Sequence, residues 1–96
     1  MKLYIDTSNR ERITVGINNK RFETNSKEKS SQTLLPFIDR LLIAEDIDIN
    51  DITEIEVNTG PGSFTGLRIG IAVANTLGFV LKVPVNGKKE ELEINY

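Results

Sequence analysis

The stretch GPGSFTGLRIG at residues 60–70 decides the fold, because it joins a strand-like run to a helix-like run through four glycines and a proline. Glycine reaches positive φ and lets another backbone approach closely. The opening Gly-Pro-Gly therefore predicts a fixed turn after a strand. Ser63 or Thr65 is then placed to cap the helix that follows.

A glycine-rich junction of this kind can also bind phosphate, since free N–H groups at the start of a helix point at the anion. The stretch does not match a Walker loop, which needs a lysine directly after its last glycine, where this chain has Leu67 and Arg68. It also lacks the spacing of a dinucleotide fingerprint and the acidic residue that follows about twenty residues on. The spacing leaves two interpretations open, a tight turn with close helix packing or an anion site.

The residues of this loop closely resemble those of the TsaB family, also called YeaZ, and three other segments agree with that family in order and position. KLYIDTS at 2–8 resembles its first strand and DTS turn, SSQTLLPFIDRLL at 30–42 its first helix, and VLKVPVNG at 80–87 the strand after its second helix. The resemblance implies a TsaB-like N-terminal lobe over residues 1–87 and a charged C-terminal tail over 88–96, with the family's usual second lobe absent. The family's His-Ser-Glu-like run at the first helix is Ser-Ser-Gln here.

The apolar pattern predicts an α/β fold in the order β-β-β-α-β-α-β. Alternation at 13–17 indicates a half-buried strand, and Asn18-Asn19 indicates a hairpin turn after it. Leucine and isoleucine at helical spacing predict a first helix with Pro36 in its first turn. The expected strands are 3–5, 13–17, 20–24, 55–58 and 83–85, and the expected helices are 33–44 and 63–82. A mixed five-stranded sheet of this order resembles a single actin-like, ribonuclease-H-like lobe.

Length and composition narrow the functional classes. Ninety-six residues make one domain, and 39% hydrophobic with 27% charged residues predicts a globular chain. With neither histidine nor cysteine, this chain offers no serine–histidine catalysis, thiolate metal site or disulfide. A net charge of −2 gives no excess of positive charge for nucleic acid. The most apolar region, 69–85, is interrupted by polar residues and is shorter than a membrane span, so we expect a cytoplasmic protein without membrane contact.

A turn and one arginine carry the candidate chemistry. Asp6 follows the first strand, where actin-like ATPases face phosphate and metal, yet it can equally cap its own turn. Arg68 can bind a phosphate or a partner carboxylate, or reach solvent or a carboxylate of its own chain. We expect no catalytic residue and no metal site. The candidate phosphate or nucleotide contacts are Asp6, Thr7, Gly60, Gly62 and Ser63.

An acidic run at Asp46, Asp48 and Asp51 has only a superficial likeness to a metal loop. It lacks the glycine and the distal glutamate that an EF-hand requires. We interpret it as a solvated connector.

Small residues recur every four positions in the second helix, which is apolar nearly all round. A helix apolar on more than one face needs more cover than one sheet provides, so the surplus predicts an interface. The predicted interface residues are Leu34, Phe37, Ile38, Leu41, Gly66, Arg68, Gly70, Ala74 and Gly78.

The resemblance implies a non-catalytic partner subunit that supports a TsaD-like catalytic subunit in threonylcarbamoyl transfer to tRNA adenosine. It also implies a TsaE-like ATPase in the same complex, dimer formation through the two helices and tRNA contact only through the complex. We expect no cofactor held firmly by this chain alone, with ATP a candidate ligand at a partner interface. The alternative is a nucleotide-binding or hydrolysing enzyme of the actin-like ATPase group. A glycoprotease is a third reading, for which the sequence offers neither metal ligands nor a nucleophile–base pair.

Overall fold

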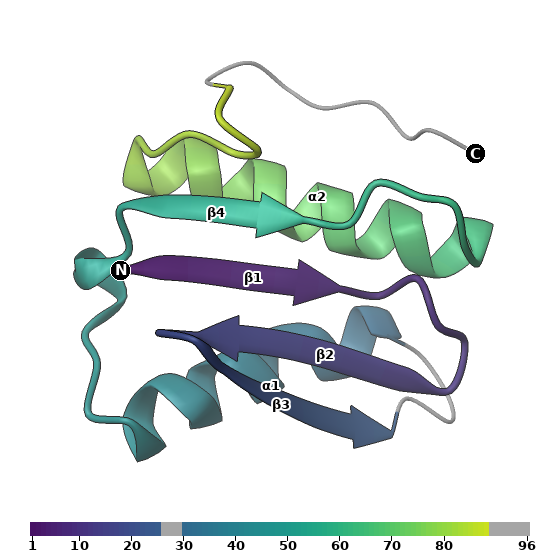
Figure 1. Ribbon diagram of the computed structural model, residues 1–96, viewed down its shortest axis with the longest axis horizontal. Coiled ribbons are helices and arrows are strands. Elements are labelled where there is room, and N and C mark those ends of the chain that lie inside the picture. The colour runs from purple at the N-terminus through teal and green to yellow at the C-terminus, as the bar shows by residue number, and fades with distance from the viewer. Residues whose placement is uncertain (26–29, 89–96) are drawn as a thin grey trace.

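Four strands and two α-helices form two layers in the computed structural model, which describes residues 1–25 and 30–88, with only the backbone at residues 30 and 31 (Figure 1). The strands are β1 (Lys2–Asp6), β2 (Arg12–Ile17), β3 (Lys20–Asn25) and β4 (Glu54–Val57). The helices are α1 (Ser30–Ala44) and α2 (Phe64–Leu81), with a short 3₁₀ helix, η1 (Ile49–Asp51), between α1 and β4.

The sheet has the strand order β3-β2-β1-β4, in which β1 pairs antiparallel with β2 and parallel with β4. Both helices lie behind the sheet in Figure 1, α2 against β4 and β1, and α1 against β2 and α2. Side chains alternate across a strand, so every second residue faces the helices. Those residues are buried and form the centre of the core: Leu3, Ile5, Ile13, Val15, Ile17, Ile55 and Val57.

The hairpin between β2 and β3 confirms the predicted turn. Asn18 and Asn19 have φ angles of 50° and 69°, the left-handed conformation that asparagine tolerates best among residues with a side chain. Phe22 of β3 pairs with Val15 and packs against the core, as its place in the alternation predicts.

Helix α1 begins earlier than predicted. It starts at Ser30 rather than near Thr33, so Pro36 lies inside the helix and the prediction that it occupies the first turn is wrong. Proline has no N–H, and an exposed position tolerates it because water can satisfy the carbonyl left without a donor. Residues 26–29, which precede the helix, lie outside the described residues.

The fifth strand expected at 83–85 is not formed as a strand. Only Val85 pairs with β4, in a single parallel bridge to Ile55. The segment is too short for more, because Lys82 ends α2 in the left-handed conformation and a turn begins directly after Val85. The described residues thus contain a mixed sheet of four strands. The tail predicted at 88–96 lies outside the described residues, except for Lys88.

The acidic connector folds on itself. Asp48 caps η1 by accepting a hydrogen bond from Asn50 N at 2.8 Å, and Asp51 accepts one from Asp48 N at 3.2 Å. These carboxylates are exposed, as expected of a solvated connector.

Among the described residues, α2 is the one helix long and apolar enough to cross a membrane by length and composition. Core helices of soluble proteins meet the same description. Here α2 contacts β4, β1 and α1, and its glycine-containing face is buried against them.

Candidate functional site

The turn after β1 and the loop after β4 meet at the start of α2. Parallel neighbouring strands end at the same edge of a sheet, so the residues that follow them lie together. The two segments are joined directly, since Ser63 N donates a hydrogen bond to Ser8 O at 2.8 Å. We call this place the junction and define it as residues 6–8, 58–63 and Gly66.

Asp6 organises the polar side of the junction. Its carboxylate accepts hydrogen bonds from Ser8 N at 2.9 Å and from Ser8 Oγ at 2.6 Å. Asn58 Nδ2 donates to the same oxygen at 3.3 Å, and Tyr4 Oη donates to the other at 3.2 Å. Two roles were left open for Asp6, contact with phosphate or metal and capping of its own turn. In the structure Asp6 caps its own turn.

These contacts shift the ionisation of Asp6. Partial burial of the carboxyl group works to raise the pKa, but the hydrogen bonds from Ser8, Asn58 and Tyr4 outweigh it and hold the pKa of Asp6 below its ordinary value. The ionised form is therefore favoured in the folded state.

This pKa shift predicts acid sensitivity at the junction. A carboxyl group whose folded pKa is depressed contributes stability above its unfolded pKa, and that stability is lost as the pH falls through the folded value. We expect the contribution, about 1 kcal/mol for a partly exposed carboxylate, to be present above about pH 4 and lost below it. Urea denaturation of the wild type and of Asp6→Asn, from pH 7 to pH 2.5, checks this.

The Asp6→Asn variant should lose less stability on acidification than the wild type. Glu11→Gln, an exposed substitution that removes the same charge, serves as the matched control and should follow the wild type. Parallel pH profiles for all three proteins would contradict the assignment.

The apolar side of the junction is a close contact between α2 and the turn after β1. Thr7 is fully buried, and its hydroxyl donates a hydrogen bond to the carbonyl of Gly66. A Cβ at Gly66 would collide with the carbonyl oxygen of Thr7, and one at Gly70 with its hydroxyl. At Gly62 it would lie 2.6 Å from Ser8 Cβ. These glycines have the structural role that the sequence suggested.

The loop supports this contact. Gly60 has a φ of 129°, a conformation that residues with a side chain rarely adopt. Its N–H donates a hydrogen bond to Asn58 Oδ1 at 3.0 Å. The peptide bond between Gly60 and Pro61 is cis. Ser63 caps α2, accepting a hydrogen bond from Gly66 N at 3.4 Å, which confirms one of the two predicted caps.

The junction brings together all five candidate phosphate contacts, Asp6, Thr7, Gly60, Gly62 and Ser63. Several of their polar groups bind one another, as the cap, the turn and the loop hydrogen bonds illustrate. In the part of the chain that the structure describes, no three acidic residues gather as metal ligands. Nucleotide contact at this site stays a prediction.

Eight of the nine predicted interface residues are buried in the chain's own core. The prediction that they are exposed to a partner is therefore wrong. The helix stripe faces the sheet, where Gly66 and Gly70 admit Thr7, and Gly78 admits Val85. The eight are Leu34, Phe37, Ile38, Leu41, Gly66, Gly70, Ala74 and Gly78. The physical reason is that small residues serve close packing of any neighbour, and here the neighbour belongs to the same chain.

The apolar residues that do reach the surface of the helices are not among the predicted interface residues. They are Leu35, Ile43, Phe64, Phe79 and Val80. A helical projection places Ile43 opposite the buried face of α1, and that signal could have found it, whereas Leu35 lies at the edge of that face, next to Leu42.

Arg68 is the exception among the predicted interface residues, because it is exposed on α2. Its guanidinium lies 5.5 Å from the ring centre of Phe64, within range of a cation–π contact. A shallow groove of about 360 Å³ runs beside it, lined by Thr65, Ile69 and Ala72. Within the described residues Arg68 forms no ion pair, so its fork of donors faces solvent.

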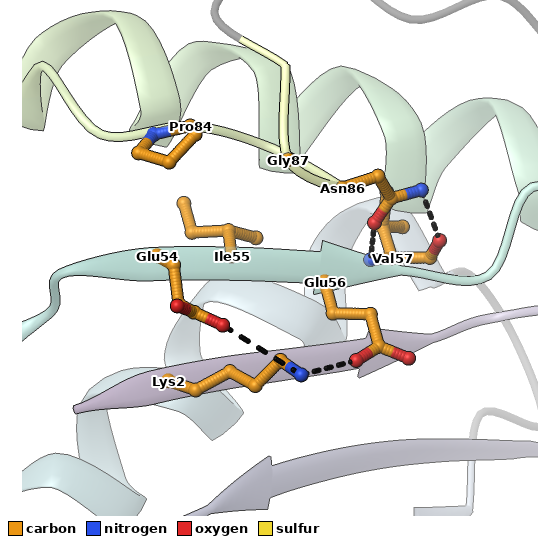
Figure 2. A pocket seen from close by; sticks show the side chains of 8 residues that line it. All are labelled: Lys2, Glu54, Ile55, Glu56, Val57, Pro84, Asn86 and Gly87. Atoms are coloured by element: carbon orange, nitrogen blue, oxygen red, sulfur yellow. Dashed lines mark hydrogen bonds and ion pairs between the residues drawn. The ribbon is translucent and has the colours of Figure 1, made fainter.

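A second groove, of about 400 Å³, lies at β4 and is lined by residues of β4, by Lys2 of β1 and by Pro84, Asn86 and Gly87 (Figure 2). Lys2 of β1 lines it and forms ion pairs with Glu56 at 2.7 Å and Glu54 at 3.6 Å. Hydrogen bonding and charge from Glu56 raise the pKa of Lys2 above its ordinary value. Lys2 neutralises one of the two glutamate charges, and no nucleophile paired with a base is among the residues that line this groove.

Comparison with models of protein families gives a match. The model described as TsaD, tRNA N6-adenosine threonylcarbamoyltransferase, matches residues 23–87. The TsaB proteins of tRNA threonylcarbamoyladenosine biosynthesis are similar as well. That of Bacillus subtilis is 37% identical over 91 residues, which is 88% of this chain and 38% of the relative. That of Escherichia coli is 36% identical over 72 residues, 75% of this chain and 31% of the relative.

The solved structures agree with the sequences. YeaZ from Pseudomonas aeruginosa superposes with a TM-score of 0.74 at 30% identity, over 88% of this chain and 40% of that protein. The chain spans about a third of the length of the curated relatives it matches, between 30% and 38% for the first four.

Proposed function

The chain belongs to the TsaD family, as a TsaB/YeaZ-type member, and we propose from this premise that it is a partner subunit in the formation of threonylcarbamoyladenosine on tRNA. In this role it supports a TsaD-like catalytic subunit and performs no chemical step itself. The observation that carries the proposal is the agreement of sequence and fold with the TsaB and YeaZ proteins over most of this chain. The sequence contains no histidine and no cysteine, which favours a non-catalytic role over a catalytic one.

The outer surface of the two helices is the contact surface we propose for the catalytic subunit and for a second copy of the chain. Leu35 and Ile43 expose 50% and 71% of their surface on α1, and Arg68 lies beside Phe64 on α2. An exposed apolar surface next to a guanidinium that has no ion pair within the described residues suits a partner with apolar side chains and a carboxylate.

The remaining components follow from the same premise. We propose that a TsaE-like ATPase joins the complex, that tRNA meets this chain only through its partners, and that ATP binds at a partner interface. The place of action is the cytoplasm. The alternative of an independent actin-like ATPase is not favoured, because the similar curated proteins are named for threonylcarbamoyladenosine formation.

Reconstitution tests the proposal. The purified chain is added to a TsaD-like subunit, a TsaE-like ATPase, tRNA and a threonylcarbamoyl donor, and the modified adenosine is measured. We expect the yield to rise with added chain and the chain to co-purify with the TsaD-like subunit. Failure of both results contradicts the proposal, and ATP hydrolysis by the chain alone that Asp6→Ala abolishes would favour the alternative.

Arg68 gives a sharper prediction within this proposal. Arg68→Ala should leave the melting temperature within about 2 °C, since exposed substitutions are usually neutral, and should weaken binding to the TsaD-like subunit by roughly tenfold. Arg68→Lys should recover only part of the loss, because lysine keeps the charge without the planar fork. Calorimetric titration and thermal melts provide the two measurements.

Arg12→Ala is the matched control for charge. Arg12 lies on β2 and pairs with Glu23 at 3.4 Å, away from the helix surface. Equal losses of binding for the two alanine variants would mean a general charge effect. Unfolding by Arg68→Ala would instead make Arg68 a structural residue.

A further inference from the structure

Strand β3 is an open edge of the sheet (Figure 1). It pairs with β2 on one side, and no strand of the described residues pairs with it on the other. Its residues run without a proline or a break in register, so the outer side presents a regular row of backbone groups. The N–H and C=O groups along such an edge can pair with a strand of another chain.

The hairpin turn determines which backbone groups of β3 point outward. A two-residue turn is closed by a hydrogen-bonded pair, which here is Ile17 with Lys20. Hydrogen-bonded and non-hydrogen-bonded pairs alternate along an antiparallel ladder. Arg21 and Glu23 therefore belong to pairs of the second kind, and their N–H and C=O groups point away from β2.

The side chains of Arg21 and Glu23 carry opposite charges on the uncovered face of the sheet. Phe22, between them, packs against the core, so its two neighbours lie on the face away from the helices, and both are exposed. The guanidinium of Arg21 lies 4.1 Å from the ring centre of Tyr4 and forms no ion pair within the described residues. Glu23 pairs with Arg12 at 3.4 Å and has a second carboxylate oxygen for another cation.

Charge selects one register for a second copy of β3 that runs antiparallel to the first. The outward backbone groups allow Arg21 to lie opposite Arg21, Glu23 or Asn25 of the second copy. The first register brings two arginines together, and the last one sets Glu23 against Glu23. The middle register places Arg21 opposite Glu23 twice, once on each side of a two-fold axis. Opposite charges directly across a ladder stabilise it, whereas like charges destabilise it.

The two-fold axis of the favoured register passes beside Phe22. The two copies of Phe22 then form a non-hydrogen-bonded pair, the kind with the shorter Cα separation of about 4.5 Å. Phe22 is only half-buried in the single chain, so part of its side chain is available to its counterpart on the helix side of the sheet. An aromatic pair at the centre and an ion pair on either side make the contact self-complementary.

The opposite edge strand has its outward groups occupied. Ile55 N donates a hydrogen bond to Pro84 O at 3.0 Å, and Ile55 O accepts one from Asn86 N at 2.8 Å. The side-chain amide of Asn86 bonds both backbone groups of Val57. Because β3 offers its outer side and β4 does not, pairing of identical edges closes at two copies.

We propose that two copies of this chain pair β3 with β3 in antiparallel orientation, with Arg21 of each copy opposite Glu23 of the other. The result is one sheet that is continuous through both copies. This contact lies at the edge of the sheet and differs from the outer helix surface described above. The inference does not rest on the proposed function.

Charge reversal tests the register. Arg21→Glu and Glu23→Arg should each dimerise roughly tenfold more weakly than the wild type in analytical ultracentrifugation at millimolar concentration, because pairs of like charge replace pairs of opposite charge. An equimolar mixture of the two variants should recover the wild-type affinity, since each copy then supplies the charge that the other needs. Glu54→Arg, the same charge change at the exposed surface of β4, is the matched control and should associate as the wild type does.

Amide hydrogen exchange of the full chain locates the contact. The amides of Arg21 and Glu23 should exchange more slowly as the protein concentration rises, whereas the amide of Phe22, which points toward β2, should not change. A dimer formed through the helices would leave the Arg21 and Glu23 amides unchanged.

Four results would overturn the proposal. They are a monomer at millimolar concentration, a dimer whose Arg21 and Glu23 amides exchange at the same rate at every concentration, and mixed charge variants that fail to recover association. The fourth is protection of these amides only after a TsaD-like subunit is added, which would assign the edge to that partner.

Discussion

Replacing Gly66 with alanine should lower the melting temperature by roughly 10–20 °C, the expected consequence of losing about 2–3 kcal/mol in a chain of this size. The reason is the close approach of α2 to the turn after β1. A methyl group at Gly66 would collide with the carbonyl oxygen of Thr7, and backbone cannot rotate away as the end of a side chain can. Thermal melts followed by circular dichroism measure the change.

The sign of this effect distinguishes a steric collision at Gly66 from the ordinary effect of helix propensity. Glycine to alanine inside a helix normally stabilises by up to about 1 kcal/mol, because alanine has the higher helix propensity. Thr76→Ala, at an exposed position of α2, is the matched control and should stabilise slightly. A Gly66→Ala protein at least as stable as the wild type would disprove the close contact at the junction.

Leu34→Ala should cost about 2–4 kcal/mol of unfolding free energy, and Leu35→Ala less than about 1 kcal/mol. The two leucines are neighbours in α1, but Leu34 is fully buried whereas Leu35 is 50% exposed. Removing a buried side chain loses transfer free energy and leaves a cavity that the core fills only in part. Urea denaturation of both variants measures the difference.

We expect the opposite order for the two leucines when binding to a TsaD-like subunit is measured instead of stability. Leu35→Ala should weaken binding while the chain stays folded, if the outer surface of α1 is the contact surface. A stable Leu34→Ala protein with impaired binding would restore Leu34 to the interface and remove it from the core.

Local signals predicted much of the fold. The period of two at residues 13–17 and the Asn-Asn turn identify β2 and its hairpin, because strand alternation and positive φ are properties of a few neighbouring residues. The start of α1 was missed because residues 30–32 are polar and carry no apolar period. The fifth strand was predicted in error, because three apolar residues in a row predict a strand without indicating the turns that confine it.

The candidate site depends on contacts that a local pattern does not contain. The capping role of Asp6 was one of two open interpretations, and the hydrogen bonds from Ser8 favour it. The carboxylate also accepts a hydrogen bond from Asn58, 52 residues away, which no local pattern predicts. Only the parallel pairing of β1 with β4 brings these residues together. The same holds for the glycine stripe, whose spacing predicts a close neighbour without specifying whether that neighbour is the same chain or another.

Asn86 has a consequence for strand addition at the edge of the sheet. Its side-chain amide accepts from Val57 N at 2.8 Å and donates to Val57 O at 3.0 Å, as a peptide group of a neighbouring strand would (Figure 2). A bare donor and acceptor at a sheet edge are a template on which a strand of another molecule can add. By occupying both with a side chain, Asn86 terminates the hydrogen-bond ladder of β4 at Val57, so edge-to-edge aggregation has no starting point there.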